Sequence, residues 1–371
     1  MNMQIDLEKG IANVGDVSRM KEVMARAKRG GRLVIGFIGG SITQGSLSST
    51  PQTCYAYRVY TWWKETFPQA EFVYCNAGIG GTTSEFGAAR VGTDLLAERP
   101  DFVIVEFSVN DESTEHFKGP YEGLVRNILG AGANAQVMHA AIGRHYDLPS
   151  VSMQNSIYPE VVAGRIENRA ITPDDLHPND EGHALVASVI TYFLEQVRSG
   201  KLTGSNASFA LGAKLPVPLT KNAYEDSVRI RNAAAPDMAG LQQPTLDGFT
   251  PDETAQNEIT DCFRYGWTAK KTGDAITFLV EGSCIAVQYR KSVKLPAPVA
   301  LAVVDDDTEH AVRLDANFDE TWGDKLELAT LLEHGKEGRH IVTIRLAETH
   351  EDDAVPFYLV SVIATGRRGR D

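Results

Sequence analysis

The sequence lacks the features of zinc-binding, membrane-spanning and nucleic-acid-binding proteins. It has only four cysteines, and none forms a CxxC pair, which argues against a zinc site. No apolar run reaches the ~18 residues of a membrane span, and the best candidate, residues 184–194, contains Thr191 and Tyr192. Lysine and arginine number 36 against 49 aspartates and glutamates, and the resulting net charge of −13 repels a nucleic-acid backbone. We therefore expect no metal, no organic cofactor, no membrane and no nucleic acid as partners.

A secretory signal is also missing from the start of the sequence. The first residues, MNMQIDLEKG, have no basic segment followed by an apolar stretch. This indicates a cytoplasmic protein, in which reduced, buried thiols are expected at Cys54, Cys75, Cys262 and Cys284.

The first half of the sequence alternates between strand and helix patterns. Short apolar runs typical of buried parallel strands occupy residues 33–38, 72–75 and 101–109. Helices are favoured around them, at residues 16–28, 55–67, 84–98, 122–129 and 182–198. Repeated βα units predict an α/β domain with a parallel sheet covered by helices.

One stretch of this domain allows two interpretations. Residues 136–142 fit a fourth strand, but Asn134 could equally cap a helix that runs to about Tyr146. In the second case residues 151–153 would lead into a strand. We favour the helix, which would leave the sheet short by one strand in this region.

The character of the sequence changes after about residue 200. Residues 201–260 are rich in Gly, Pro, Asn, Ser and Thr and show no helical period. Short β-type runs separated by turn residues follow at 275–280, 284–289, 299–304, 311–314, 340–346 and 357–363. This pattern predicts a β-sandwich or jelly roll. We therefore divide the chain into a first domain of residues 1–200 and a second of residues 201–371, which also fits a length of 371 residues.

Two segments carry the residue types of a nucleophile and its base. Ser41 follows the first expected strand in a Gly-Gly-Ser turn, at the strand end where α/β active sites form. His177 lies just before the last helix of the domain, three residues after Asp174. A carboxylate at this spacing can accept the Nδ1 proton and leave Nε2 as a base. The adjacent Asp175 is a second candidate for the acid, although the spacing favours Asp174.

Two further segments could stabilise negative charge on a reacting oxygen. The glycine-rich run 76–82 follows the second expected strand and contains Gly81, whose N–H could point at an oxyanion. Asn110 follows the third strand, and its amide could donate to the same oxygen. Each segment alone is also an ordinary turn, so the argument depends on their joint order.

That order resembles the SGNH, or GDSL-like, hydrolases, which are named for Ser, Gly, Asn and His in four blocks. Ser41, Gly81, Asn110 and His177 match the blocks, and Asp174 matches the acid of the triad. The resemblance covers roughly residues 30–200. It implies a flavodoxin-like parallel sheet with helices on both faces and an oxyanion hole formed by Ser41, Gly81 and Asn110.

Two positions depart from the usual family pattern. Gly40 stands where the family often has Asp, and Ser108 where it often has Gly. Neither change removes a catalytic group, and both suggest a branch distant from the typical lipases.

The whole chain resembles a narrower group, carbohydrate esterase family 17, the mannan acetylesterases. Residues 39–51, residues 107–113 and the β-rich second half, similar to a carbohydrate-binding module, carry this likeness. The resemblance implies a serine esterase that removes acetyl groups from plant-type oligosaccharides, with acetylated manno-oligosaccharides favoured. The alternatives are a lipase or thioesterase of the same fold, and a sugar-binding protein with an inactive hydrolase domain.

Residues that bind the sugar are expected in two places. Gln44 belongs to a polar loop after Ser41 that could hydrogen-bond sugar hydroxyls. Trp267 and Trp322 lie near turns of the second domain, and an exposed indole can stack on a sugar ring. We expect Trp322 to lie at the rim of the active site. The sequence leaves open the acetyl position and whether the chain forms a homo-oligomer.

Overall fold

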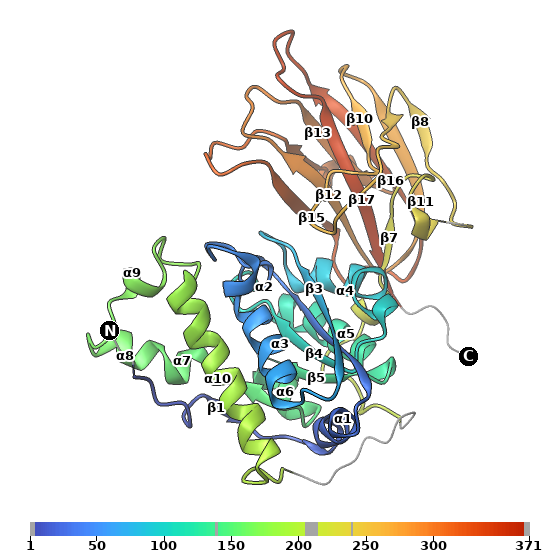
Figure 1. Cartoon of the computed structure of the whole chain (residues 1–371). Coiled ribbons are helices and arrows are strands. Elements are labelled where there is room, and N and C mark those ends of the chain that lie inside the picture. Colours follow the sequence, from blue (N-terminus) through green and yellow to red (C-terminus); the bar gives the residue numbers. More distant parts are fainter. Residues whose placement is uncertain (1–3, 138–139, 205–213, 239, 367–371) are drawn as a thin grey trace. The chain divides into compact units, whose positions relative to one another are not determined.

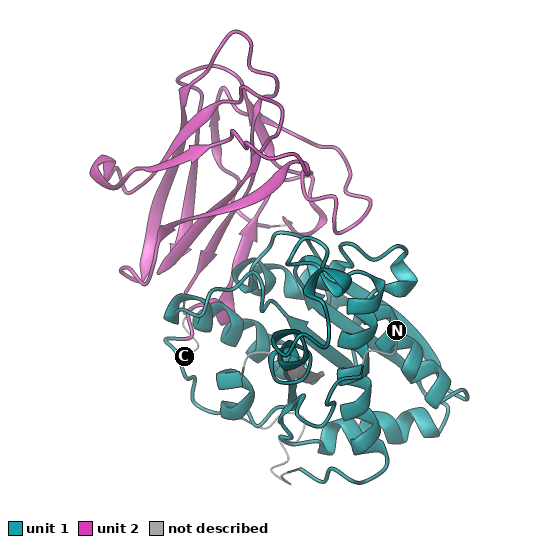
Figure 2. Cartoon of the chain, turned by 90° about the vertical axis from the view of Figure 1, so that its left-hand side faces the viewer, with its two compact units in different colours: residues 1–221 teal, residues 222–371 magenta. Residues whose placement is uncertain are grey.

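The chain folds into two compact units. The structure, a computed structural model, describes residues 4–137, 140–204, 214–238 and 240–366. Unit 1 comprises Met1–Lys221 and unit 2 comprises Asn222–Asp371 (Figure 2). Each is described by itself below.

Unit 1 is built on a six-stranded sheet. The order is β1-β6-β5-β4-β2-β3, in which only β1 runs antiparallel to its neighbour. The strands are β1 (Ile11–Asn13), β2 (Arg32–Gly39), β3 (Glu71–Gly78), β4 (Phe102–Glu106), β5 (Asn134–Val137) and β6 (Ser150–Val151). The five parallel strands follow the flavodoxin order, which confirms the predicted fold. The order reverses between β2 and β4, and ligands of such sheets bind at this switch point.

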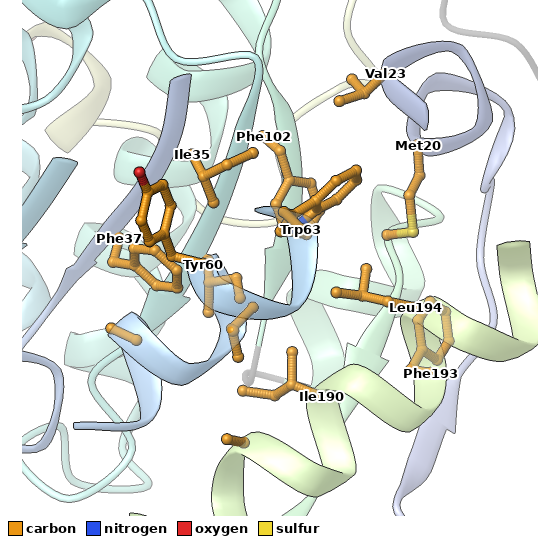
Figure 3. Packing of buried hydrophobic residues seen from close by; sticks show 14 of the residues in the cluster. Met20, Val23, Ile35, Phe37, Tyr60, Trp63, Phe102, Ile190, Phe193 and Leu194 are labelled. Carbon is orange, nitrogen blue, oxygen red and sulfur yellow. The ribbon is translucent and has the colours of Figure 1, made fainter. Parts of the chain in front are cut away.

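Helices cover both faces of this sheet (Figure 1). They are α1 (Ser18–Lys28), α3 (Tyr55–Thr66), α4 (Ser84–Asp94), α5 (Glu115–Gly130), α6 (Ala140–His145) and α10 (Asp180–Arg198). On one face, Ile35 and Phe37 of β2 pack with Trp63 of α3 and Phe193 of α10 (Figure 3). On the other, α4 and α5 pack against each other. Within the described residues, even α10 lacks the combination of length and apolar character that a membrane span requires.

The preferred interpretation of residues 134–146 is wrong. Asn134–Val137 form β5, which pairs in parallel with Phe102–Val105 of β4, and the helix α6 begins only at Ala140. Residues 138–139 lie outside the described residues. The alanines of this stretch favour a helix, but pairing satisfies backbone groups along the edge of β4 that a helix would leave unpaired. The sheet is therefore complete.

Three short helices, for which the sequence analysis gave no expectation, separate β6 from α10. They are α7 (Met153–Ser156), α8 (Tyr158–Val162) and α9 (Asn168–Ile171). They enclose a small core of their own, in which Ile157, Ile166 and Ile171 pack with Leu185 of α10. This helical segment leads directly into the turn that carries Asp174 and His177.

Unit 2 is the predicted β-sandwich. One sheet has the order β15-β12-β17-β10-β9, with β7 beside β17, and the other has the order β14-β13-β16-β11-β8. The first comprises β15 (Lys325–Leu332), β12 (Cys284–Lys291), β17 (Phe357–Thr365), β10 (Trp267–Ala269), β9 (Thr250–Pro251) and β7 (Val228–Ile230). The second comprises β14 (Val312–Asp315), β13 (Val299–Val304), β16 (Gly338–Glu348), β11 (Ala275–Gly282) and β8 (Thr245–Asp247). The pairings between these strands are antiparallel.

The boundary between the units lies about twenty residues later than the predicted one at residue 200. Residues 216–220 are held by unit 1. The buried carboxylate of Glu122 accepts hydrogen bonds from the backbone of Leu219 and Thr220, and Arg126 donates to the carbonyl of Pro216. A polar segment without periodicity looks like the start of a new domain, but these hydrogen bonds attach it to the first.

All four cysteines are free thiols, as the sequence analysis expected. Cys54, Cys262 and Cys284 are buried, and Cys75 is partly buried. Burial raises the pKa of the Cys54 and Cys75 thiols to about 11, so both are protonated at neutral pH.

Candidate active site

Ser41 lies at the switch point of the sheet. The strand β2 ends at Gly39, and Ser41 is the first residue of the short helix α2 (Ser41–Gln44), where its side chain is almost completely buried. The turn before it has no room for side chains. A Cβ on Gly39 would lie 2.2 Å from the Glu106 carbonyl oxygen, and one on Gly40 would lie 2.1 Å from Oδ1 of Asn110.

Ser41, His177 and Asp174 form a continuous chain of hydrogen bonds. Nε2 of His177 lies 2.9 Å from Oγ of Ser41, and Nδ1 lies 2.6 Å from Oδ2 of Asp174. A carboxylate can only accept, so Nδ1 carries the proton and Nε2 is left to accept from the serine hydroxyl. This is the arrangement of nucleophile, base and orienting acid in serine hydrolases.

The turn around His177 also fixes the Asp174 carboxylate. Its Oδ1 accepts from the backbone N–H of Leu176, at 3.0 Å, and of His177, at 2.6 Å. Partial burial raises the pKa of Asp174, but the hydrogen bonds from the side chain and backbone of His177 outweigh it, and the net pKa is lowered. Asp174 is therefore ionised at neutral pH.

Asp175 points to different partners. Its carboxylate accepts from the Arg169 guanidinium, at 2.7 Å, and from the Asn168 amide, at 2.9 Å. Its backbone has a φ of +64°, so the chain turns sharply between the two aspartates. Of the two candidates that the sequence left open, only Asp174 touches His177.

The glycine-rich loop after β3 lies beside Ser41. A Cβ on Gly80 would be 3.7 Å from Cβ of Ser41. Gly81 has a φ of +68°, a conformation that favours glycine, and apart from its chain neighbours no heavy atom of the described residues lies within 4 Å of where its Cβ would be. The open side of Gly81 leaves space for a ligand next to the serine.

Asn110 approaches Ser41 from β4. Its Oδ1 is buried beside Gly40 and accepts no hydrogen bond from any of the described residues. The amide is planar, so its NH₂ end lies on the side opposite Oδ1. This leaves the NH₂ as the end of the amide that can donate to a bound oxygen.

Gln44 lies against the glycine loop. Its Oε1 accepts from the backbone N–H of Gly80 at 2.6 Å, which ties the loop to the helix that carries Ser41. Nearby, the Asn76 side chain donates to the carbonyl of Thr43 and accepts from the N–H of Gly78. The sequence analysis considered Gln44 only as a contact for sugar and did not single out Asn76.

Two buried carboxyl groups at the end of β4 were also missed. Glu106 accepts from the backbone and hydroxyl of Ser108, and burial raises its pKa. Asp111 accepts from the N–H of Ser84 at the start of α4, and burial raises its pKa to about 6. The signal in the sequence was the acidic residue inside the apolar run at 101–109, which the strand pattern concealed.

The two tryptophans proposed for sugar binding differ in exposure. Trp267 is buried in the sandwich core and packs edge-on against Phe278, so its ring is not available to stack on a sugar. Trp322 is 62% exposed on the surface of unit 2 and packs edge-on against Phe318 at a ring distance of 5.1 Å. Only Trp322 offers a ring face to solvent.

A serine, a histidine and an aspartate in hydrogen-bond contact at the switch point of a flavodoxin-like sheet are typical of an acyl-transferring serine hydrolase. The model of the GDSL-like lipase/acylhydrolase family matches residues 37–185, which include all five residues of the predicted site. No curated protein matches the chain.

Two crystal structures are similar to this chain over its whole length. One is a two-domain esterase active on acetylated mannans, co-crystallised with mannopentaose; it is 59% identical, with 99% of this chain and 100% of that chain covered and a TM-score of 0.91. The second, also of a two-domain esterase active on acetylated mannans, is 60% identical with the same coverage and TM-score. The chain belongs to the GDSL-like lipase/acylhydrolase family.

Proposed function

We propose that this protein is a serine esterase that removes O-acetyl groups from manno-oligosaccharides. The observation that carries the proposal is the hydrogen-bonded chain Ser41–His177–Asp174, in a protein about 60% identical over its full length to an esterase active on acetylated mannans. The test is mass spectrometry of acetylated mannan, xylan and pectin oligosaccharides after incubation with the protein. Loss of 42 mass units, roughly one acetyl group, from the mannan products alone is the expected result.

The chemistry is a two-step acyl transfer. Nε2 of His177 takes the proton of Ser41 while Oγ attacks the acetyl carbonyl carbon. The tetrahedral intermediate collapses when the C–O bond to the sugar breaks, and His177 returns the proton to the departing sugar oxygen. His177 then deprotonates a water molecule that attacks the acetyl-serine, so acetate leaves and Ser41 regains its proton. No metal or organic cofactor takes part.

The oxyanion of each tetrahedral intermediate needs hydrogen-bond donors. The backbone N–H groups of Ser41 and Gly81 and the Asn110 amide are our candidates. Three observations support them: the position of Ser41 at the start of α2, the open face of Gly81, and the inward-turned Oδ1 of Asn110. Preorganised donors of this kind each contribute about 10²–10³ in kcat.

Gln44 should act on the rate through the glycine loop. Gln44→Met keeps the size of the side chain but removes the acceptor for the Gly80 N–H, so we expect kcat to fall about tenfold, less than loss of a donor itself. KM should change less than about twofold. Gln44→Glu keeps an acceptor oxygen and should restore most of kcat. A raised KM with an unchanged kcat would instead assign Gln44 to sugar contact.

Trp322 should contribute to recognition of the sugar. Stacking acts on the ring and not on the acetyl group, so Trp322→Ala should lower kcat/KM on an acetylated oligosaccharide about tenfold, or 1.4 kcal/mol. The same variant should barely change the hydrolysis of 4-nitrophenyl acetate. Leu301→Ala, which removes another exposed apolar side chain of unit 2, is the matched control. Equal losses on both substrates would indicate a folding defect, and no loss would exclude the role.

We also propose that the enzyme works in the cytoplasm on imported oligosaccharides. The four cysteines are thiols rather than disulfides, which supports a reducing compartment, where thiols persist. Fractionation of the producing cells, with an antibody against this chain, tests the location.

A further inference from the structure

The mechanism assigns no part to Asp111, the residue that follows Asn110. Its Oδ2 is buried and has no hydrogen-bond partner among the described residues. Burial raises the pKa of this carboxyl to about 6, and the contact with Ser84 offsets only part of that rise. At neutral pH an ionised carboxylate is therefore held where its charge is unfavourable, which is frequent among groups that serve catalysis.

The turn that carries both residues is fixed to the end of β4. The backbone N–H groups of Asn110 and Asp111 donate to the same acceptor, the carbonyl of Phe107, at 3.0 and 2.9 Å. The Phe107 side chain is fully buried and lies against α4, where a Cβ on Gly87 would be 2.8 Å from its ring. A shift of the Asp111 backbone would therefore also shift Asn110.

The carboxylate of Asp111 holds the start of α4. Its Oδ1 accepts from the backbone N–H of Ser84, the first residue of the helix, at 2.9 Å. Thr83 occupies the N-cap position, but its side chain makes no capping hydrogen bond. Asp111 thus supplies, from 27 positions along the chain, the acceptor that the start of a helix needs, and the helix dipole favours a negative charge there.

The glycine loop is consequently anchored on both sides of Gly81. On one side, the N–H of Gly80 donates to Gln44 at 2.6 Å, which ties the loop to the helix of the nucleophile. On the other side, the N–H of Ser84 donates to Asp111, which ties the loop to the turn of the third candidate donor. Two hydrogen bonds from side chains to the backbone therefore join all three segments of the oxyanion hole.

We propose that Asp111 is a positioning residue, whose carboxylate holds the Gly81 loop and the Asn110 amide at the spacing that the oxyanion requires. This rests on the proposed function, because it takes these groups as oxyanion donors. A hydrogen bond to a charged group is about twice as strong as one between neutral groups. The ionised carboxylate therefore holds the loop more firmly than a neutral side chain of the same shape.

Asp111→Asn tests the charge, because it keeps the size of the side chain and an acceptor oxygen. We expect kcat on 4-nitrophenyl acetate at pH 8 to fall about tenfold, less than for loss of a donor itself. KM should stay within about twofold, since the oxyanion exists only after the attack on the ester. The melting temperature should not fall, because folding raises the pKa of Asp111 and its ionisation therefore costs stability at this pH. A kcat within twofold of the wild type, or a higher kcat, would overturn the proposal.

The pH dependence separates positioning from a defect of the fold. Below about pH 6 Asp111 takes up a proton and resembles the amide, so the ratio of wild-type to variant kcat should fall from about ten at pH 8 to about two at pH 5. Protonation of His177 affects both proteins and cancels in the ratio. The other ionisable groups facing Asp111, present in both proteins, are Glu106 of β4 and His116 of α5, which pairs with Glu85 of α4. A ratio that stays constant from pH 5 to 8 would overturn the proposal.

Asp101, at the opposite end of β4, offers a matched control. Its Oδ2 accepts from the backbone N–H of Val34 at 2.8 Å, and its Oδ1 pairs with Arg26. Asp101→Asn makes the same chemical change at the edge of the sheet away from Ser41, so kcat should stay within about twofold at every pH. A loss that matches Asp111→Asn in size and pH dependence would mean that any loosening of β4 lowers the rate, and would overturn the specific role of Asp111.

The wild-type protein distinguishes this proposal from the proposed function. If it hydrolyses neither 4-nitrophenyl acetate nor acetylated manno-oligosaccharides, the proposed function fails. If it hydrolyses both and Asp111→Asn matches it across the pH range, only the positioning role fails.

Discussion

Replacing Ser41 with alanine should lower kcat for acetyl ester hydrolysis by about 10⁴–10⁶. The hydroxyl of Ser41 is the group hydrogen-bonded to Nε2 of His177, so its removal leaves the base with nothing to activate for acyl transfer. The side chain is small and sits at the start of a four-residue helix, so the fold should persist. Steady-state kinetics on 4-nitrophenyl acetate, with thermal unfolding as a check on the fold, measures the effect.

Ser46→Ala is a suitable control for this variant. Ser46 lies five residues further along the same polar loop, and its backbone carbonyl, not its side chain, contacts Nε2 of His183. Its replacement should leave kcat within about twofold. A Ser41→Ala protein that keeps a tenth of the wild-type activity, without contaminating enzyme, would remove Ser41 from the mechanism.

The contacts among Ser41, His177 and Asp174 could be predicted from the sequence because their geometry is largely local. Asp174 and His177 are three residues apart in a turn, and the same aspartate caps the backbone N–H of His177, so the spacing nearly determines the contact. The position of Ser41 could be predicted because it depends only on a strand that ends just before it and a helix that begins there. The glycines at 39 and 40 indicated this turn, although the close approach of Asn110 to Gly40 appears only in the structure.

Features that depend on distant segments could not be predicted in this way. The four residues of β5, Asn-Ala-Gln-Val, have no clear strand pattern, and their pairing along β4 makes them a strand. The edge strand β15 was missed because its sequence KLELATLL is rich in residues that favour a helix, although its first four residues alternate between polar and apolar. The contact between Gln44 and Gly80 joins residues 36 positions apart, and a cavity of unit 1 is lined by side chains from residues 42 to 186. A pattern within a short stretch of sequence cannot reveal contacts between residues so far apart.

Asp174→Asn should lower kcat by about 10⁴, as expected for loss of the orienting acid in a serine triad. The Asn amide can donate to Nδ1 of His177, which would then carry its proton on Nε2. A protonated Nε2 faces the Ser41 hydroxyl as a donor and cannot take its proton. The shape of the turn should survive, because the amide oxygen can still accept from the backbone of Leu176 and His177.

Asp175→Asn provides a matched comparison one residue away. Both aspartates are exposed, both have a lowered pKa, and both lie in the same turn, but the pKa of Asp175 is lowered by the Arg169 and Asn168 side chains and not by His177. Loss of an exposed ion pair has little effect, so kcat should stay within about threefold of the wild type. The kcat values of the two variants, measured on the same ester at pH 7 to 8, therefore distinguish two effects. One is the loss of the group that orients His177, and the other is the loss of a negative charge in the turn. A larger loss for Asp175→Asn would mean that the turn rearranges when substrate binds and that Asp175 is the acid.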